Sequence, residues 1–217
     1  MKTLRRAYAV LAMVLLAGCA STPSAVYDYS KLKAENPLSI LVLPPLNESL
    51  EVNASYSFLS QVTYPLAESG YYVFPVAMVN DLFKHNGMTE PGEIHAVPME
   101  KLREIFAADA VVYLKITEYG TSYKVLSSET RVTAQARLVS LKTGEELWQG
   151  SATASTAEQQ GSSSDVLAML LIAVIDQVAN TLSNKGHEVG GITSARLLHA
   201  GGPNRLLYGP RSQQQEP

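Results

Sequence analysis

Residues 136–152, "ARLVSLKTGEELWQGSA", are the stretch that decides the fold. In the segment that leads into it, residues 129–141, apolar and polar side chains largely alternate. One side carries Val132, Ala134, Ala136 and Leu138, and the other carries Arg131, Thr133, Gln135, Arg137 and Val139. Such alternation is typical of an antiparallel strand with one buried face. Residues 142–145 supply a turn in which Gly144 can adopt a positive φ, and residues 146–154 return as the partner strand.

The segments before this hairpin alternate between strands and helices. Short apolar runs predict strands over residues 38–43, 71–74 and 110–117. Apolar spacing predicts helices over residues 55–69, 76–87, 98–106 and 166–183, the last ending near Gly186, with residues 88–97 as a loop. Strand–helix alternation implies right-handed crossovers and parallel pairing. The predicted fold is an α/β three-layer sandwich, in which a mixed, mostly parallel sheet carries an antiparallel hairpin.

The first residues have the features of a secretory signal peptide. Lys2, Arg5 and Arg6 precede an apolar run over residues 7–17, which is too short to span a bilayer as a helix. Leu16-Ala17-Gly18-Cys19 resembles the lipobox of bacterial lipoproteins. That resemblance implies cleavage before Cys19 and acyl chains on its sulfur. Lipoproteins that are retained at the inner membrane carry Asp directly after this cysteine. Ala20 at that position therefore implies the outer membrane.

Cys19 is the only cysteine in the chain, so it has no partner for an internal disulfide. Several acyl chains on this residue would give long-lived membrane attachment. We therefore divide the chain into a signal peptide (1–18), a lipidated cysteine with a flexible tether (19–37), an α/β domain (38–185) and a C-terminal tail (186–217). We expect the tail to be partly packed and then disordered.

The charge of the mature chain excludes some partners. Removal of Lys2, Arg5 and Arg6 leaves 14 basic and 20 acidic residues, a formal charge of −6. An acidic protein without a basic cluster is not expected to bind nucleic acid.

Three stretches together resemble the periplasmic α/β domain shared by the TolB N-terminal domain and CsgG-type secretion lipoproteins. They are "LVLPPLNES", "LREIFAADAVVYLKITEY" and the hairpin itself. The matching positions are Ala108-Asp109 before a strand, Thr143-Gly144-Glu145 at the turn, and Leu147 and Trp148 after it. With the lipobox, the chain is similar to a lipoprotein family of unknown function that includes a meningococcal surface-antigen candidate. The resemblance implies a TolB-like fold, a homodimer and membership of an envelope transport system, with no catalytic residues.

Residues 120–128 are too short for the membrane-inserted hairpins of CsgG, so we expect no pore.

No catalytic or phosphate-binding motif is present in the sequence. His85, Glu90, Glu93 and His95 fall within eleven residues and could bind a divalent metal in an envelope enzyme, although a solvated surface loop accounts for them as well. His187 and His199 fall in the predicted tail, where we expect solvent exposure. We expect no catalytic residue, no metal site and no cofactor.

The predicted last helix is apolar around most of its circumference, and such a helix needs neighbours on two sides. We expect a dimer or partner interface at Val166, Leu167, Met169, Leu170, Ile172 and Val174. The alternative is that the chain's own tail covers this helix through Leu197, Leu198, Leu206, Leu207 and Tyr208.

The sequence thus favours a lipid-anchored, non-catalytic binding or scaffolding subunit of an outer-membrane-associated transport or secretion assembly, facing the periplasm or the cell surface. The alternatives are the metal-dependent enzyme using the His85–His95 loop, or a solute-binding lipoprotein with Tyr71, Tyr72 and Trp148 lining its pocket.

Overall fold

The computed structural model describes residues 27–124, 127–160 and 182–214. In this part of the chain a single sheet has the strand order β3-β1-β4-β5-β6, with β2 also paired to β4. The strands are β1 (Ser39–Val42), β2 (Leu46–Asn47), β3 (Tyr72–Val73), β4 (Ala110–Lys124), β5 (Ser127–Ser140) and β6 (Glu146–Ser155). Pairs among β1 to β4 are parallel, whereas β4–β5 and β5–β6 are antiparallel. The expected mixed α/β class and the hairpin over residues 136–152 are confirmed.

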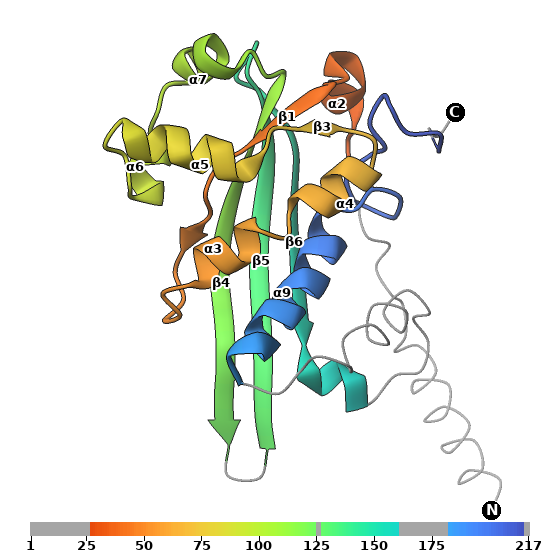
Figure 1. Ribbon diagram of the computed structural model, residues 1–217. Helices are drawn as coiled ribbons and strands as arrows, with labels where there is room; N and C mark the ends of the chain where they lie inside the picture. Colours follow the sequence, from red (N-terminus) through yellow and green to blue (C-terminus); the bar gives the residue numbers. More distant parts are fainter. Residues whose placement is uncertain (1–26, 125–126, 161–181, 215–217) are drawn as a thin grey trace, which may run out of the picture.

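The helices lie against both faces of this sheet (Figure 1). They are α2 (Ser30–Glu35), α3 (Ala54–Leu59), α4 (Thr63–Glu68), α5 (Val76–His85), α6 (Pro91–His95), α7 (Met99–Phe106) and α9 (Leu182–Leu198), with a 3₁₀ helix η2 (Thr156–Gln160). In β1, Ile40 and Val42 enter a core with α3, α4 and α9, while Leu41 enters a second core with α5, α6 and α7. Alternate residues of a strand point to opposite faces, so β1 contributes to both cores.

The predicted helix over residues 55–69 is two short helices, α3 and α4. The break falls at residues 60–62, and Pro65 lies in the first turn of α4, where its missing N–H is not needed. The predicted loop over residues 88–97 contains α6, which begins with Pro91 at the first helical position.

Strands β4 and β5 are longer than predicted, and they extend beyond the rest of the sheet as a two-stranded ribbon (Figure 1). The expected strand end at Thr117 is wrong, because antiparallel pairing resumes after a bulge between Ile116 and Glu118. The residues beyond the bulge are too polar to be recognised as a strand from hydrophobicity alone.

The predicted end of the last helix at Gly186 is also wrong. Helix α9 passes through Gly186 and ends at Leu198. A Cβ atom at Gly186 would lie 2.9 Å from the Tyr119 ring, so this glycine serves close packing against β4 instead of ending the helix. Residues 186–198, which we expected in the tail, therefore form a helix on the sheet, and Leu197, Leu198 and Leu206 are buried in the core.

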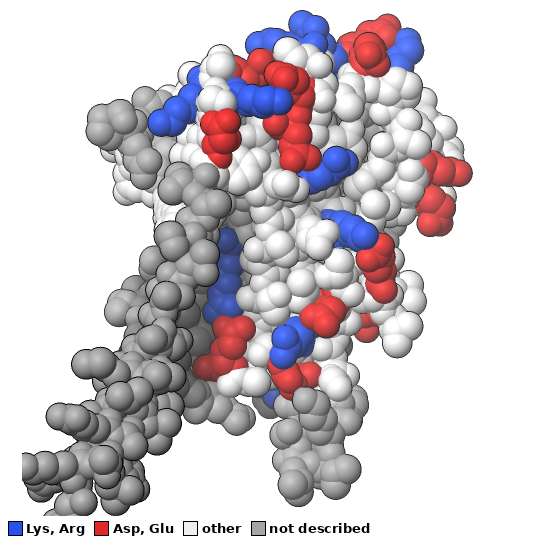
Figure 2. Space-filling view, turned by 180° about the vertical axis from the view of Figure 1, so that it is seen from behind, with Lys and Arg blue, Asp and Glu red and all other residues white. Residues whose placement is uncertain are grey.

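Basic and acidic side chains are mixed on the face seen from behind (Figure 2). Among the described residues, pairs such as Lys115–Glu48 (2.7 Å) and Arg137–Glu146 (3.6 Å) join opposite charges. This face therefore has no extended patch of one sign. None of the described helices is both long and apolar enough to span a bilayer.

Candidate functional site

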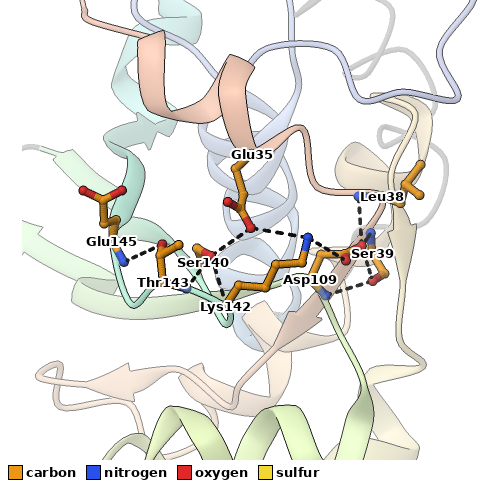
Figure 3. A network of polar contacts seen from close by, with 8 residues as sticks. All are labelled: Glu35, Leu38, Ser39, Asp109, Ser140, Lys142, Thr143 and Glu145. Atoms are coloured by element: carbon orange, nitrogen blue, oxygen red, sulfur yellow. Dashed lines mark hydrogen bonds and ion pairs between the residues drawn. The ribbon is translucent and has the colours of Figure 1, made fainter.

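Asp109, the acidic member of the Ala-Asp pair, joins the first residues of β1 to those of β4 (Figure 3). Its Oδ2 atom accepts hydrogen bonds from the backbone N–H groups of Leu38 (3.1 Å) and Ser39 (3.0 Å) and from Ser39 Oγ (2.8 Å). In return, Asp109 N–H donates to Ser39 Oγ (3.0 Å). Burial acts to raise the pKa of Asp109, but these hydrogen bonds and nearby Lys142 outweigh it, so the pKa lies below its usual value.

The same network continues into the turn between β5 and β6 (Figure 3). Ser140 Oγ donates to Glu35 of α2 (3.0 Å) and accepts the backbone N–H groups of Lys142 and Thr143, both at 3.1 Å. Lys142 Nζ lies 3.6 Å from Glu35 and 3.9 Å from Asp109. Gly144 has φ +73°, as the turn pattern predicted. The motif residues of this network thus hold strand ends together.

We predict that Asp109→Ala lowers the free energy of unfolding by about 2–3 kcal/mol, because the partly buried N–H and hydroxyl of Ser39 and the exposed N–H of Leu38 lose a charged acceptor. Lys142→Ala is the matched control. It removes only half-exposed ion pairs and should cost less than about 1 kcal/mol. Urea unfolding measures both values.

The difference between wild type and Asp109→Ala should also depend on pH. The pKa of Asp109 is depressed in the folded state, so its contribution is present above the ordinary value of 3.8 and is lost as the pH falls through the folded-state pKa. Equal effects of the two substitutions at pH 7 would contradict this role of Asp109.

The histidines that suggested a metal site contact backbone carbonyls. His95 Nε2 lies 2.9 Å from Pro44 O, and its ring packs edge-on against Tyr113. Burial lowers the pKa of His95, although the bond with Pro44 acts in the opposite direction. His85 Nδ1 lies 2.8 Å from Asp81 O. The described residues contain no group of three His, Cys, Asp or Glu side chains that could hold a metal ion.

His187 lies on α9 instead of in a tail, and there it joins a small polar cluster. Ser57 Oγ of α3 lies 2.8 Å from His187 Nδ1 and 2.6 Å from Tyr119 Oη of β4. Gln61 donates to the backbone carbonyl of His187 (2.9 Å). The cluster connects three elements across the start of α9. A nucleophile–base–acid relay is incomplete here, because the partners of the His187 ring among the described residues are Ser57 and Gln61 and include no carboxylate.

The three aromatic residues considered for a solute pocket have different surroundings in the fold. Tyr71 is buried and donates to Leu207 O (2.8 Å), and burial raises its pKa. Tyr72 is exposed at the edge of the sheet, under the guanidinium of Arg211. Trp148 is buried and donates to Asn204 O (3.3 Å).

A groove of about 410 Å³ runs along the outer edge of β6. Its floor is formed by residues 148–153 of β6. Its walls come from Tyr27, from Arg196 and Leu197 of α9, and from residues 203–205. Tyr27 Oη accepts the N–H of Gln149 (3.2 Å), and Tyr27 N–H donates to Asn204 Oδ1 (2.9 Å). The first described residue is thereby fixed to the rim of the groove.

Two of our site predictions lie outside the described residues. They are the lipidation site Cys19 and the expected interface at Val166, Leu167, Met169, Leu170, Ile172 and Val174.

Comparison with known proteins places the chain in a family. The family model described as "Putative lipoprotein GNA1162-like" matches residues 27–211. The chain belongs to the GNA1162-like lipoprotein family. The membership expected from the sequence is therefore confirmed.

The relatives of this GNA1162-like chain include a lipoprotein of Neisseria meningitidis serogroup B, NMB1124/NMB1162, which is 45% identical over 206 residues and 95% of each chain. The crystal structure of lipoprotein GNA1162 from N. meningitidis is 52% identical, with a TM-score of 0.55 over 67% of this chain and 100% of that one. A PelC dodecamer from Paraburkholderia phytofirmans is 15% identical, with a TM-score of 0.44 over 76% and 91% of the two chains. The PelC likeness is too remote to bear on function or assembly.

Sequence reasoning missed the groove beside β6. Its residues come from four segments that are far apart in the chain, and none of these segments carries a motif of its own. The available signal was the absence of charged residues and proline from residues 149–153, since such residues commonly protect an edge strand.

Proposed function

We propose that this protein is a lipid-anchored, non-catalytic binding or scaffolding subunit of an outer-membrane-associated transport or secretion assembly, and that it acts as a homodimer. The observation that carries the proposal is the fixed position of Tyr27. Tyr27 follows Cys19 by eight positions and is held to the domain by Asn204 and Gln149.

This position limits how far the domain can lie from the membrane. Eight residues span at most roughly 29 Å when fully extended. With acyl chains on Cys19, the rim of the β6 groove would remain within that distance of the lipid surface. A domain confined in this way meets other envelope proteins more often than a freely diffusing domain would. Such confinement suits a binding or scaffolding role.

The polar side chains support a non-catalytic role. Asp109 and Lys142 hold strand ends, His95 contacts a backbone carbonyl, and Ser57 connects α3 to α9 and β4. These contacts give each group a structural task. We also propose that the three-layer sandwich has the form of the TolB N-terminal domain. The resemblance to that domain implies a role in the cell envelope.

The homodimer rests on the apolar composition of residues 166–174, "VLAMLLIAV". A run that is apolar at nearly every position requires cover on more than one side. Where a second copy of the chain provides this cover, two-fold pairing is the commonest arrangement.

Sedimentation of a chain that begins at Ala20 tests the dimer. We expect twice the monomer mass, and we expect the double substitution Leu170→Glu/Ile172→Glu to give a monomer. Ser163→Glu in the neighbouring polar stretch is the matched control and should leave the dimer intact. Cross-linking in whole cells should also capture another envelope protein. A monomer at all concentrations, with no cross-linked partner, would refute the proposal.

A further inference from the structure

We propose that the groove beside β6 binds an extended peptide segment of a partner protein, which adds to the sheet as a further strand and places an acidic side chain on Arg205. This inference rests on the proposed binding function and names the chemistry of the partner. It is argued from the hydrogen-bonding pattern of β6, the ends of the groove and its charge.

Strand β6 is the last strand of the sheet among the described residues. In an antiparallel ladder, residues alternate between bonding to the neighbouring strand and pointing their N–H and C=O groups away from it. Gln149 N–H donates to Tyr27, and Thr153 C=O accepts from Arg196 (2.7 Å), so these two residues point away from β5. Ser151 lies midway between them and has the same orientation.

Tyr27 and Arg196 therefore occupy the two outermost backbone groups of this segment. Four groups remain between them along the floor of the groove: the C=O of Gln149, the N–H and C=O of Ser151, and the N–H of Thr153. No hydrogen bond to these four groups is found in the described part of the chain. Their spacing matches the backbone of a short antiparallel strand, and peptides bind sheet edges in this way in many recognition domains.

The edge is also unprotected. Edge strands usually carry charged residues, proline or a bulge that discourage pairing with another chain. Residues 149–153 ("QGSAT") contain neither charge nor proline, and their ladder to β5 is regular. The bulge in this pair lies earlier in β6, at Leu147, between the pairs Val139–Glu146 and Leu138–Trp148.

The charge of the groove selects an acidic segment. Its charged lining residues are Arg196 and Arg205, in a chain with more acidic than basic residues. Arg196 is paired with Glu158 (2.7 Å), whereas no acidic partner of the Arg205 guanidinium is found among the described residues.

The wall that carries Arg205 is held in place before any ligand arrives. The backbone carbonyl of Arg205 accepts from Tyr29, and that of Asn204 accepts from Trp148. Because Asn204 and Tyr27 both contact the segment around Trp148 and Gln149, Arg205 lies toward the Gln149 end of the groove. In an antiparallel arrangement, the acidic residue would then be near the C-terminal end of the bound peptide.

Fluorescence anisotropy with the full mature protein in detergent micelles tests the proposal. The probe is fluorescein-labelled Thr-Val-Thr-Val-Asp with an amidated C-terminus, and the control probe carries Asn in place of Asp. We expect saturable binding of the Asp peptide above the signal of empty micelles. We expect the Asn peptide to bind wild type about three- to fivefold more weakly than the Asp peptide does. The Asp peptide should bind Arg205→Gln more weakly by the same factor, because an exposed ion pair contributes up to about 1 kcal/mol.

Two further measurements examine the strand pairing itself. Ser151→Pro removes the N–H that faces the groove and should weaken binding at least tenfold, whereas Ser151→Ala keeps this N–H and should bind as wild type. Should Ser151→Pro fail to fold, N-methylated peptides give the same information with the protein unchanged. Methylation at alternate peptide residues should abolish binding, and methylation at the residues between them should not.

Absence of saturable binding, equal binding by Ser151→Pro and Ser151→Ala, or equal effects of all N-methyl positions would overturn the proposal. Membrane attachment and dimer formation are measured without peptide. A failure here would therefore leave the proposed function standing with a different binding surface.

Discussion

Replacing Gly70 by alanine should lower the free energy of unfolding by about 3 kcal/mol or more. Gly70 has φ +90°, a conformation that disfavours any side chain. A Cβ atom there would also lie 2.4 Å from the backbone nitrogen of Ser212, because the C-terminal segment crosses directly over this turn. Gly209 N–H donates to Ser69 O (2.7 Å) and Arg211 N–H to Gly70 O (3.2 Å), so the segment cannot move away without losing these bonds.

Gly87→Ala is the matched control for this prediction. Gly87 has a similar φ of +80°, but nothing lies within 4 Å of a Cβ atom at this position. Its replacement should cost only the backbone term, about 1 kcal/mol. For a domain of this size, the extra 2 kcal/mol corresponds to a melting temperature lower by about 4–8 °C. Equal melting temperatures for the two variants would show that the C-terminal segment does not pack on Gly70 in solution.

The second large effect concerns the proposed anchor. Cys19→Ala should prevent lipidation. The protein should then be found in the soluble fraction of the cell envelope, or should keep its signal peptide uncleaved. Each buried methylene of an acyl chain contributes about 0.8 kcal/mol of membrane affinity, so loss of several chains removes essentially all attachment. Fractionation followed by immunoblotting measures the distribution. Ser21→Ala, two positions further on, is the control and should leave the protein at the membrane.

The hairpin was predictable because its pattern is local. Alternation over residues 129–141 and the positive φ available to Gly144 determine two strands and their turn without reference to the rest of the chain. The C-terminal end of the predicted helix over residues 55–69 was likewise local, and α4 ends at Glu68, within one residue of it.

The features that sequence patterns missed depend on contacts between distant residues. Glycine lowers helix propensity, so Gly186 indicated that the helix ends, whereas α9 continues through it and through Gly190 and Gly191. The side chain of Tyr119 occupies the space that a Cβ atom at Gly186 would need, and the side chain of Gln61 does the same at Gly191. Close packing of α9 on the sheet therefore outweighs the local preference.

The role of Asp109 could be predicted only in part. The Ala-Asp pair marked the start of β4 correctly, but its partners Leu38 and Ser39 are some 70 residues earlier in the chain. The groove beside β6 was out of reach for the same reason, since Tyr27 and Arg205 meet only in the folded domain.

The central claim is that acyl chains on Cys19 anchor the protein to the membrane. Mass spectrometry of the N-terminal peptide of the purified envelope protein tests it most directly. We predict that the mature chain begins at Cys19 and carries the mass of a diacylglyceryl group on its sulfur, together with any further acyl chain on its amino group. An N-terminal peptide that begins at Met1, or one in which Cys19 is an unmodified thiol, would contradict the account.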